Sequence, residues 1–303
     1  MWQTDQIDAL IRAGIYPVDA ASLLTAYIKR AGADAEKTAK DPINAVFGGV
    51  RIGQAEIDDA RTYWVQARQA RAKMLLESPV ETEVGELAQS LTLYTYSSVE
   101  DLYRIIESGK TLTRKQLESI VAEVINEFEF LLMNLSQELN DEKLDLAIWF
   151  YAVALLLQRY YLGMAALGRG TWDILRQNGI ARVEKYLSED LTRLTLFTQD
   201  IDSGRYGVLG DLSVAAILQR SNMYAGRARF LYWSLWEGPL EVDGTVLMER
   251  RYLNPAEHCS DCIRYASMGW QLSGILPDPG DRSECLSNCR CTKDKKLFPT
   301  GEI

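Results

Sequence analysis

The fold is decided by residues 113–167, which read TRKQLESIVAEVINEFEFLLMNLSQELN up to residue 140 and DEKLDLAIWFYAVALLLQRYYLGMAAL beyond it. In the first part apolar residues recur every three or four positions, which places them along one face of a helix. Thr113 and Gln116 have the spacing of a capping box, so this helix is predicted to begin at Thr113. The second part, about residues 142–167, is apolar on nearly every face and must be covered by neighbours. It is therefore predicted to be the central helix of a bundle.

Helical spacing continues over most of the chain on both sides of this pair. Asp19 is placed to cap a helix over residues 20–30, and Gly238-Pro239 is a strong stop for the last long helix. Further helices are predicted over residues 54–76, 84–93 and 212–236, with a short one from Ser98 to Gly109. Residues 1–238 are thus predicted to form a helical bundle domain, with a possible sub-boundary near residues 109–112.

A different pattern begins at residue 240, where the chain reads LEVDGTVLM. Asp243-Gly244 between two short β-prone runs predicts a hairpin, because both central residues of such a turn need positive φ. The predicted fold class is mainly α: an elongated multi-helix bundle, a short β-hairpin and a small Cys-rich zinc-binding module. The hairpin, this zinc-ribbon-like module and a basic tail make up a second domain over residues 239–303.

Charge and composition exclude several classes of function. The 303 residues include 33 Lys and Arg, 42 Asp and Glu and one His, a net charge of −9. An acidic chain is a poor general nucleic-acid binder. With His258 as the only histidine, a three-His metal site cannot form, and a Ser/His/Asp site has one possible base.

No targeting or membrane segment is expected. The N-terminal residues lack the basic and apolar regions of a signal peptide. The most apolar run, residues 146–157, is shorter than the ~20 residues that cross a bilayer, so we predict a buried helix, no membrane contact and a soluble cytoplasmic product.

All five cysteines lie within 33 residues near the end of the chain, and none precedes them. They are Cys259, Cys262, Cys285, Cys289 and Cys291. The Cys-x-x-Cys spacing presents two thiolates to one tetrahedral ion, and residues two apart in an extended segment face the same side. The stretch between the two groups is rich in Gly and Pro and too short for a core of its own. Residues 255–296, here called the cysteine module, are therefore predicted to be held together by zinc.

Other interpretations of the thiols stay open. A redox Cys-x-x-Cys lacks the flanking βαβ pattern, and disulfides conflict with an odd cysteine count and a cytoplasmic context. Inert thiols would not be expected to cluster. All five cysteines are metal-ligand candidates, with His258 as a further one, and four ligands suffice.

The residues also carry a resemblance to a known family. The order Cys259-x-x-Cys262, a Gly/Pro-rich stretch, Cys289-Arg290-Cys291 and a basic tail resembles the C-terminal module of phage head-morphogenesis proteins, the minor capsid group that includes protein F of phage Mu. Many members end in His-Pro-x-Cys-Arg-Cys, whereas Cys285 stands here near the place of that His, one residue further out. The resemblance covers about residues 205–295.

This resemblance implies a non-enzymatic, structural virion component that acts near the portal during head assembly in the bacterial cytoplasm. It implies portal or major capsid proteins as partners, packaged DNA as a further contact and a homo-oligomer as one possible assembly. Weak candidates for contact with DNA phosphates or a partner are Arg290, Lys293, Lys295 and Lys296.

Two rival functions remain open. One is a zinc-dependent DNA-binding or interaction protein. The other is a toxin or nucleotide-modifying enzyme, because some members of the resembled family carry such domains. We expect no enzyme, since no activated nucleophile with a positioned base is evident.

Overall fold

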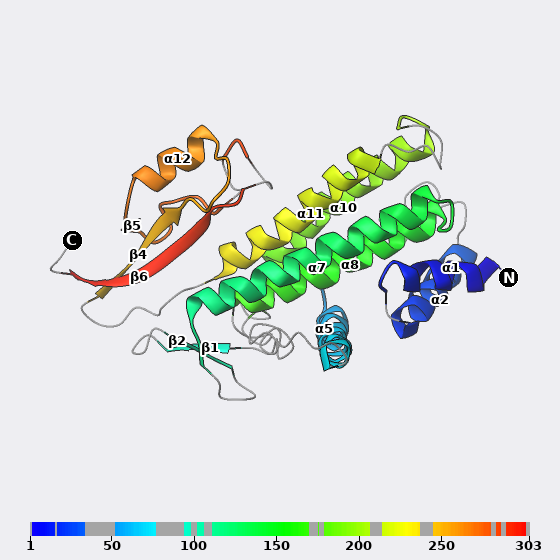
Figure 1. The fold of residues 1–303 in the computed structure, drawn as a ribbon, viewed down its shortest axis with the longest axis horizontal. Coiled ribbons are helices and arrows are strands. Elements are labelled where there is room, and N and C mark those ends of the chain that lie inside the picture. Colours follow the sequence, from blue (N-terminus) through cyan, green and yellow to red (C-terminus); the bar gives the residue numbers. More distant parts are fainter. Residues whose placement is uncertain are drawn as a thin grey trace. The chain divides into compact units, whose positions relative to one another are not determined.

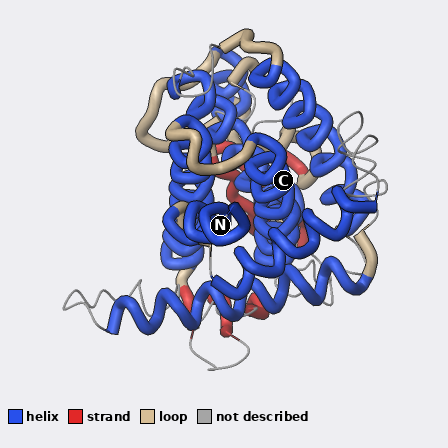
Figure 2. The backbone as a smooth tube through the Cα atoms, turned by 90° about the vertical axis from the view of Figure 1, so that its right-hand side faces the viewer, coloured by secondary structure: helices blue, strands red, loops and turns tan. Residues whose placement is uncertain are grey.

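The protein was analysed as a computed structural model, which is mainly helical. It describes residues 2–15, 17–33, 52–76, 94–97, 102–105, 111–169, 175, 179–206, 214–236, 245–279, 283–285 and 289–300. Helices make up most of this described backbone (Figure 2). The helices are α1 (Trp2–Arg12), α2 (Pro17–Ala33), α5 (Gln54–Leu76), α7 (Arg114–Asn140), α8 (Leu146–Arg169), α10 (Ile180–Asp202), α11 (Val214–Leu235) and α12 (Ser260–Ser267), as labelled in Figure 1.

The chain divides into two compact units. The first contains residues 1–63, 126–161 and 181–224; the second contains residues 64–125, 162–180 and 225–303. Each unit therefore combines segments that are distant in the sequence. The boundary between residues 238 and 239 that the sequence analysis places between two domains stays a prediction.

Helices α7 and α8 form as their sequences predict. The side chain of Gln116 accepts a hydrogen bond from the backbone N–H of Thr113 at 2.8 Å, and the Thr113 hydroxyl accepts one from the N–H of Gln116 at 3.3 Å. This reciprocal pair confirms the capping box. Helix α8 is long and apolar enough to cross a membrane by length and composition, but 89% of its most apolar window is buried inside the protein. It is a core helix, as predicted.

Aromatic side chains dominate the core of the first unit. Phe128 of α7 stacks on Tyr160 of α8 with ring centroids 4.3 Å apart, and Trp149 of α8 meets Phe197 of α10 edge-on. The buried Tyr161 hydroxyl donates a 2.6 Å hydrogen bond to Asp190 of α10, which satisfies both polar groups. These contacts join three helices into one core.

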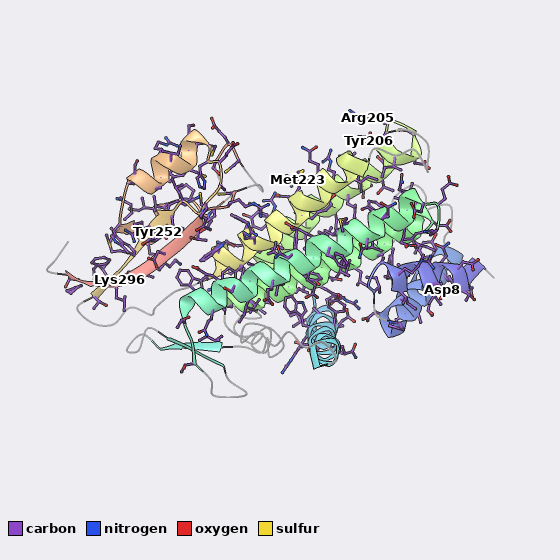
Figure 3. The ribbon with its side chains drawn as sticks, in the orientation of Figure 1. Asp8, Arg205, Tyr206, Met223, Tyr252 and Lys296 are labelled. Carbon is purple, nitrogen blue, oxygen red and sulfur yellow. The ribbon has the colours of Figure 1, made fainter. Side chains whose placement is uncertain are left out.

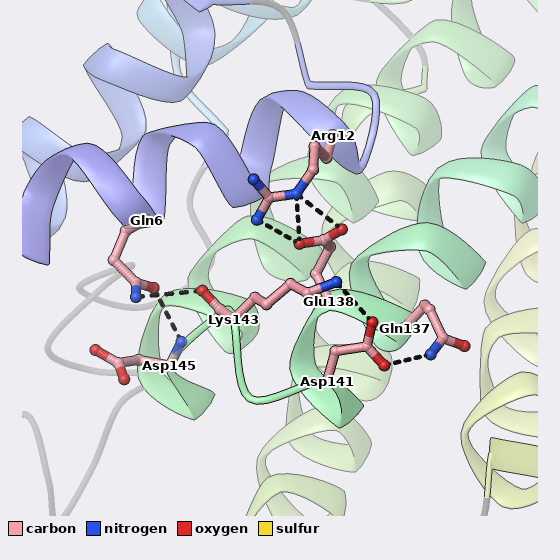
Figure 4. A network of polar contacts seen from close by, with 7 residues as sticks. All are labelled: Gln6, Arg12, Gln137, Glu138, Asp141, Lys143 and Asp145. Atoms are coloured by element: carbon pink, nitrogen blue, oxygen red, sulfur yellow. Dashed lines mark hydrogen bonds and ion pairs between the residues drawn. The ribbon is translucent and has the colours of Figure 1, made fainter. Parts of the chain in front are cut away.

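Polar contacts fasten α1 to the turn between α7 and α8. Arg12 contacts Glu138 through two nitrogens, the shorter contact being 2.9 Å. Gln6 accepts a hydrogen bond from the backbone N–H of Asp145 and donates one to the carbonyl of Lys143 (Figure 4). The side-chain amide of Gln6 thus substitutes for backbone partners that this turn lacks.

Helix α2 corrects one predicted cap. It begins at Pro17, an ordinary first helical residue, so Asp19 lies inside the first turn and is not the N-cap. The carboxylate of Asp19 instead contacts Arg159 of α8 at 3.4 Å.

The second unit contains a small sheet that sequence reasoning missed. Its strands β1 (Tyr94–Ser97), β2 (Leu102–Ile105) and β3 (Thr111–Leu112) pair antiparallel in sequence order. The short helix predicted from Ser98 to Gly109 is therefore wrong, because residues 102–105 are extended. The predicted helix over residues 84–93 lies outside the described residues, whereas the one over residues 54–76 is confirmed as α5.

A second antiparallel sheet carries the cysteine module. Strands β4 (Thr245–Tyr252), β5 (Gln271–Leu272) and β6 (Thr292–Pro299) lie in the order β5-β4-β6. The β4–β6 register runs from Thr245 opposite Pro299 to Tyr252 opposite Thr292. The predicted hairpin supplies residues 245–248 to β4, and its turn and first arm lie outside the described residues.

Candidate metal centre

The Cys-x-x-Cys pair lies at the start of a short helix. Cys259 is the N-cap of α12, with extended backbone at φ −71° and ψ 163°, and Cys262 lies in the first turn. The N–H of Ile263 donates to the carbonyl of Cys259 at 3.2 Å, which closes that turn. The turn predicted from the spacing is thus the first turn of a helix, and it holds the two thiols near each other.

The other three thiols come from segments that are anchored separately. Cys289 and Cys291 directly precede β6, whose pairing with β4 fixes their position. The segment around Cys285 is tied to α12, because Asp261 accepts the N–H of Glu284 at 3.2 Å and Ser260 donates to the Glu284 carboxylate at 3.1 Å. Helix, loop and sheet therefore converge on one point.

The five cysteine sulfurs, here called the thiol cluster, lie at metal-ligand spacing. Cys262 Sγ is 3.4 Å from Cys285 Sγ and 3.6 Å from Cys289 Sγ. Two groups have all their sulfurs within 4.8 Å of one another: Cys259, Cys262 and Cys285, and Cys262, Cys289 and Cys291. Zinc–sulfur bonds of ~2.3 Å in a tetrahedron place sulfurs ~3.8 Å apart. The cluster can therefore hold a metal ion.

The same distances bear on the disulfide alternative. All five cysteines are free thiols in the structure. Sulfurs at 3.4 and 3.6 Å are well beyond the ~2.05 Å of a disulfide bond. The geometry is thus that of unbonded sulfurs gathered around a common centre.

Burial and hydrogen bonding separate the protonation states of the thiols. A hydrogen bond from the Cys291 thiol lowers the pKa of Cys289 to about 5, helped by the backbone N–H of Cys291. Cys291 keeps the proton, so its own pKa is raised. Burial raises the pKa of Cys262 and of Cys285. Cys289 is consequently the most thiolate-like member of this set, and thiolates are the form that binds metal.

A buried cation stands beside the thiol cluster. Arg251 of β4 is 1% exposed and points one guanidinium nitrogen at Cys289 Sγ, 3.8 Å away. Another of its nitrogens donates to the carbonyl of Pro277, and its guanidinium lies 5.4 Å from the centre of the Tyr265 ring. A positive charge in this place stabilises negative sulfur.

Lys293 is placed in the interior, not on the surface where the predicted DNA or partner contact would require it. Its ammonium is 3.0 Å from Glu249 and 2.9 Å from Asp278, and it donates to the carbonyl of Leu276. Glu249 also accepts the N–H of Leu276 at 2.8 Å. The pair therefore ties β4 and β6 to the loop before Cys285, a structural role.

The other three predicted contact residues differ in exposure. The Lys295 ammonium donates to the carbonyl of Trp236 at 2.7 Å, so its charge is also directed inward. Arg290 and Lys296 are exposed, and Lys296 lies on β6 (Figure 3). Of the four, these two have side chains that solvent reaches most freely.

His258 lies beside Cys291, outside the two groups of sulfurs. Its Nε2 is 2.6 Å from the carbonyl of Asn254, which fixes the proton on that nitrogen. Its Nδ1 then carries a lone pair and lies 3.5 Å from Cys291 Sγ. A ring nitrogen whose partner nitrogen donates to a backbone carbonyl is the usual arrangement of a ligating histidine.

Sequence reasoning missed the buried ionic residues around the cluster. Glu249 and Arg251 are two apart in a strand, so both point to the same face. Two opposite charges on one face of a strand next to the cysteine module are the sequence pattern that could have indicated buried ionic residues. The pattern identifies their partners only when the pairing with the strand that carries Lys293 is known.

Comparisons with known proteins return no similar chain. No family model, no curated protein and no solved structure matches this sequence or this fold.

Proposed function

We propose that the thiol cluster binds zinc, and that zinc holds the cysteine module in shape. The observation that carries this proposal is the gathering of five thiols from a helix start, a loop and a strand start into two groups of three that share Cys262. A tetrahedral set of sulfur ligands favours zinc or iron–sulfur centres over hard cations. The module has little apolar core, so metal binding would contribute much of its folding free energy.

The test is the metal content of the purified, reduced chain. Inductively coupled plasma mass spectrometry should find zinc, and the Cys262→Ser variant should lose it, because Cys262 belongs to both groups of sulfurs. Ser267→Ala on the same helix is the matched control and should retain the metal. A chain that carries no metal after expression in zinc-supplemented medium would refute the proposal.

We further propose that the chain is a non-enzymatic structural component of a phage head, acting near the portal during assembly. The support is the arrangement of Cys259, Cys262, Cys289 and Cys291, which resembles the C-terminal module of the Mu protein F-like minor capsid group. An acidic helical body with a metal-tied end suits a protein that docks on other proteins. Portal or major capsid proteins are the proposed partners.

Co-purification tests this second proposal. The chain should sediment with heads assembled from the portal and capsid genes of the same genome, and Cys262→Ser should reduce its incorporation. If the chain binds duplex DNA with a steep dependence on salt and does not enter heads, the rival DNA-binding function is the better one.

A further inference from the structure

The thiol cluster divides into two groups of three, not one group of four. Cys259, Cys262 and Cys285 form one group and Cys262, Cys289 and Cys291 the other, with Cys262 in both. A single tetrahedral ion needs four ligand atoms that are all near one another, ~3.8 Å apart for sulfur. Among the residues that the structure describes, the thiols meet that condition three at a time. Each group is one face of a tetrahedron, and the two faces share one corner.

His258 lies next to one corner of one of the two faces. With metal–nitrogen and metal–sulfur bonds of ~2.05 and ~2.3 Å, a tetrahedral ion places the two atoms ~3.6 Å apart. The observed separation of His258 Nδ1 from Cys291 Sγ is 3.5 Å. The histidine proton is held at Nε2 by the carbonyl of Asn254, so Nδ1 is free to bind. Among the described thiols its contact is with Cys291 alone; the group whose atoms all lie within 4.8 Å of one another is Cys262, Cys289 and Cys291.

We propose that the cluster binds two divalent ions, bridged by the thiolate of Cys262. One ion is held by Cys262, Cys289 and Cys291, with His258 Nδ1 beside Cys291 as the nearest nitrogen for its fourth position. The other is held by Cys259, Cys262 and Cys285, which leaves its fourth position for water or for a side chain of a partner. This inference rests on the proposed metal binding and adds a second ion to it.

The charge of the site agrees with two ions. Five thiolates and two divalent ions sum to one negative charge, and the buried guanidinium of Arg251 next to Cys289 compensates it. One ion on four thiolates sums to two negative charges, of which Arg251 compensates half, whereas one ion on three thiolates also sums to one. A buried site is favoured when its charges are matched within hydrogen-bonding reach.

Burial distinguishes the two ions. Cys262, Cys289 and Cys291 are buried, whereas Cys259 and Cys285 are partly exposed. The ion bound by Cys259 and Cys285 together with Cys262 has nearer access to solvent. It should therefore exchange faster and leave first when a chelator is added.

Stoichiometry of the full, reduced chain tests the inference. Native mass spectrometry after addition of excess zinc should show two ions per chain, and a competition titration should show two equivalents of different affinity. One ion per chain overturns the second site and leaves the proposed function standing. No ion overturns both.

Variants separate the two positions. Cys259→Ser should keep one ion, bound through the three buried thiols Cys262, Cys289 and Cys291, while a one-ion site built on the Cys-x-x-Cys pair would lose its metal. Ser267→Ala is the control and should bind two. If Cys259→Ser fails to fold, cadmium-113 spectra of the unaltered chain decide: two resonances are expected, and a single one overturns the inference.

Discussion

Arg159 shows how a charged side chain is accommodated in an apolar helix. It lies in α8, is 5% exposed, and contacts Asp59 at 3.1 Å and Asp19 at 3.4 Å. Its guanidinium also lies 4.4 Å from the centre of the Tyr63 ring. In the sequence, Arg159 follows the apolar run of residues 146–157, with Gln158 between them. Its partners are on helices 100 and 140 residues away, so the sequence alone does not reveal the pairing.

Removing this charge should be costly. Arg159→Met leaves Asp19 buried without its partner, and breaking a buried pair in this way costs about 3–5 kcal/mol. Urea denaturation followed by circular dichroism measures the loss. The double variant Arg159→Met with Asp19→Asn should recover part of the lost unfolding free energy. If Asp19→Asn recovers none of it, the cost does not come from an unpaired Asp19 carboxylate.

Glycine is required at position 163 because α8 and the Trp64 side chain of α5 approach each other closely within the second unit. A Cβ atom at this position of α8 would overlap the indole ring of Trp64 on α5. Gly163→Ala gains helix propensity of about 1 kcal/mol but overpacks the contact, and we expect a net loss of about 1–3 kcal/mol. In a Trp64→Leu background the same substitution should be nearly neutral. Thermal unfolding of the four proteins provides the test.

Lys295 should give stability a distinct dependence on pH. Burial, reinforced by the charge of Lys293, lowers the pKa of Lys295 from 10.5 to about 8. Between these two pKa values the unfolded chain binds more protons than the folded one, so the free energy of unfolding rises as pH increases from 8 to 10.5. Below pH 8 the cost of burying the charged Lys295 ammonium is fully present.

The difference in unfolding free energy between wild type and Lys295→Met isolates this effect. It should shift in favour of wild type by roughly 1–3 kcal/mol between pH 7.5 and pH 10.5. Lys296→Met on the exposed side of β6 is the control, and its difference from wild type should stay flat. A flat difference for Lys295→Met as well would show that its ammonium is solvated.

At the scale of elements, local signals were predictable and distant pairings were not. The limits of α5 and the start of α7 follow from apolar spacing and from the Thr113–Gln116 cap, which involve neighbouring residues. Strand β2 lies in a segment that the sequence predicts to be helical. The prediction fails there because the strand is stabilised by pairing with β1, which lies outside that segment. The same reason hid the pairing of β4 with β6, since these strands are separated by the whole cysteine module.

The candidate site also has features that local sequence predicts and features that depend on distant pairing. Clustering and spacing of the cysteines predicted the thiol cluster, which the structure confirms as a possible metal-binding group. Arg251 and Lys293 have roles that depend on the sheet, so spacing did not reveal them. The sequence therefore suggested Lys293 as a contact residue for DNA or a partner, whereas the structure buries it.

The capping box supplies a test at the start of α7. Thr113→Ala removes the hydroxyl that accepts the Gln116 N–H and should cost about 1 kcal/mol. Thr113→Ser retains the acceptor and should cost a few tenths. Equal effects of the two substitutions on the unfolding free energy would show that the cap contributes little.

Across the whole molecule, apolar burial supports one part of the chain, and the proposed metal binding would support another. The first unit has a core of stacked aromatic and aliphatic side chains that needs no ion. The sheet β5-β4-β6 and α12 surround the thiol cluster and pack few buried apolar residues apart from its cysteines. The two parts should therefore respond differently when metal is removed.

Chelation tests this difference. A strong chelator should abolish near-ultraviolet dichroism from the Trp270–Phe298 contact and expose residues 255–292 to proteases, while far-ultraviolet helicity falls only slightly. Adding zinc back should restore both signals. Cooperative loss of all helix on chelation would mean that the bundle depends on the ion.

The pairing of β4 with β6 has a consequence for biosynthesis. Tyr252 at the end of β4 pairs with Thr292 at the start of β6, so these paired ends are 40 residues apart in the sequence. While the nascent chain emerges from the ribosome, β4 and the first two thiols appear long before the partners that cover them. The module can therefore close only after β6 has been synthesised. Until then, Cys259 and Cys262 lack the thiol partners that the folded module gives them.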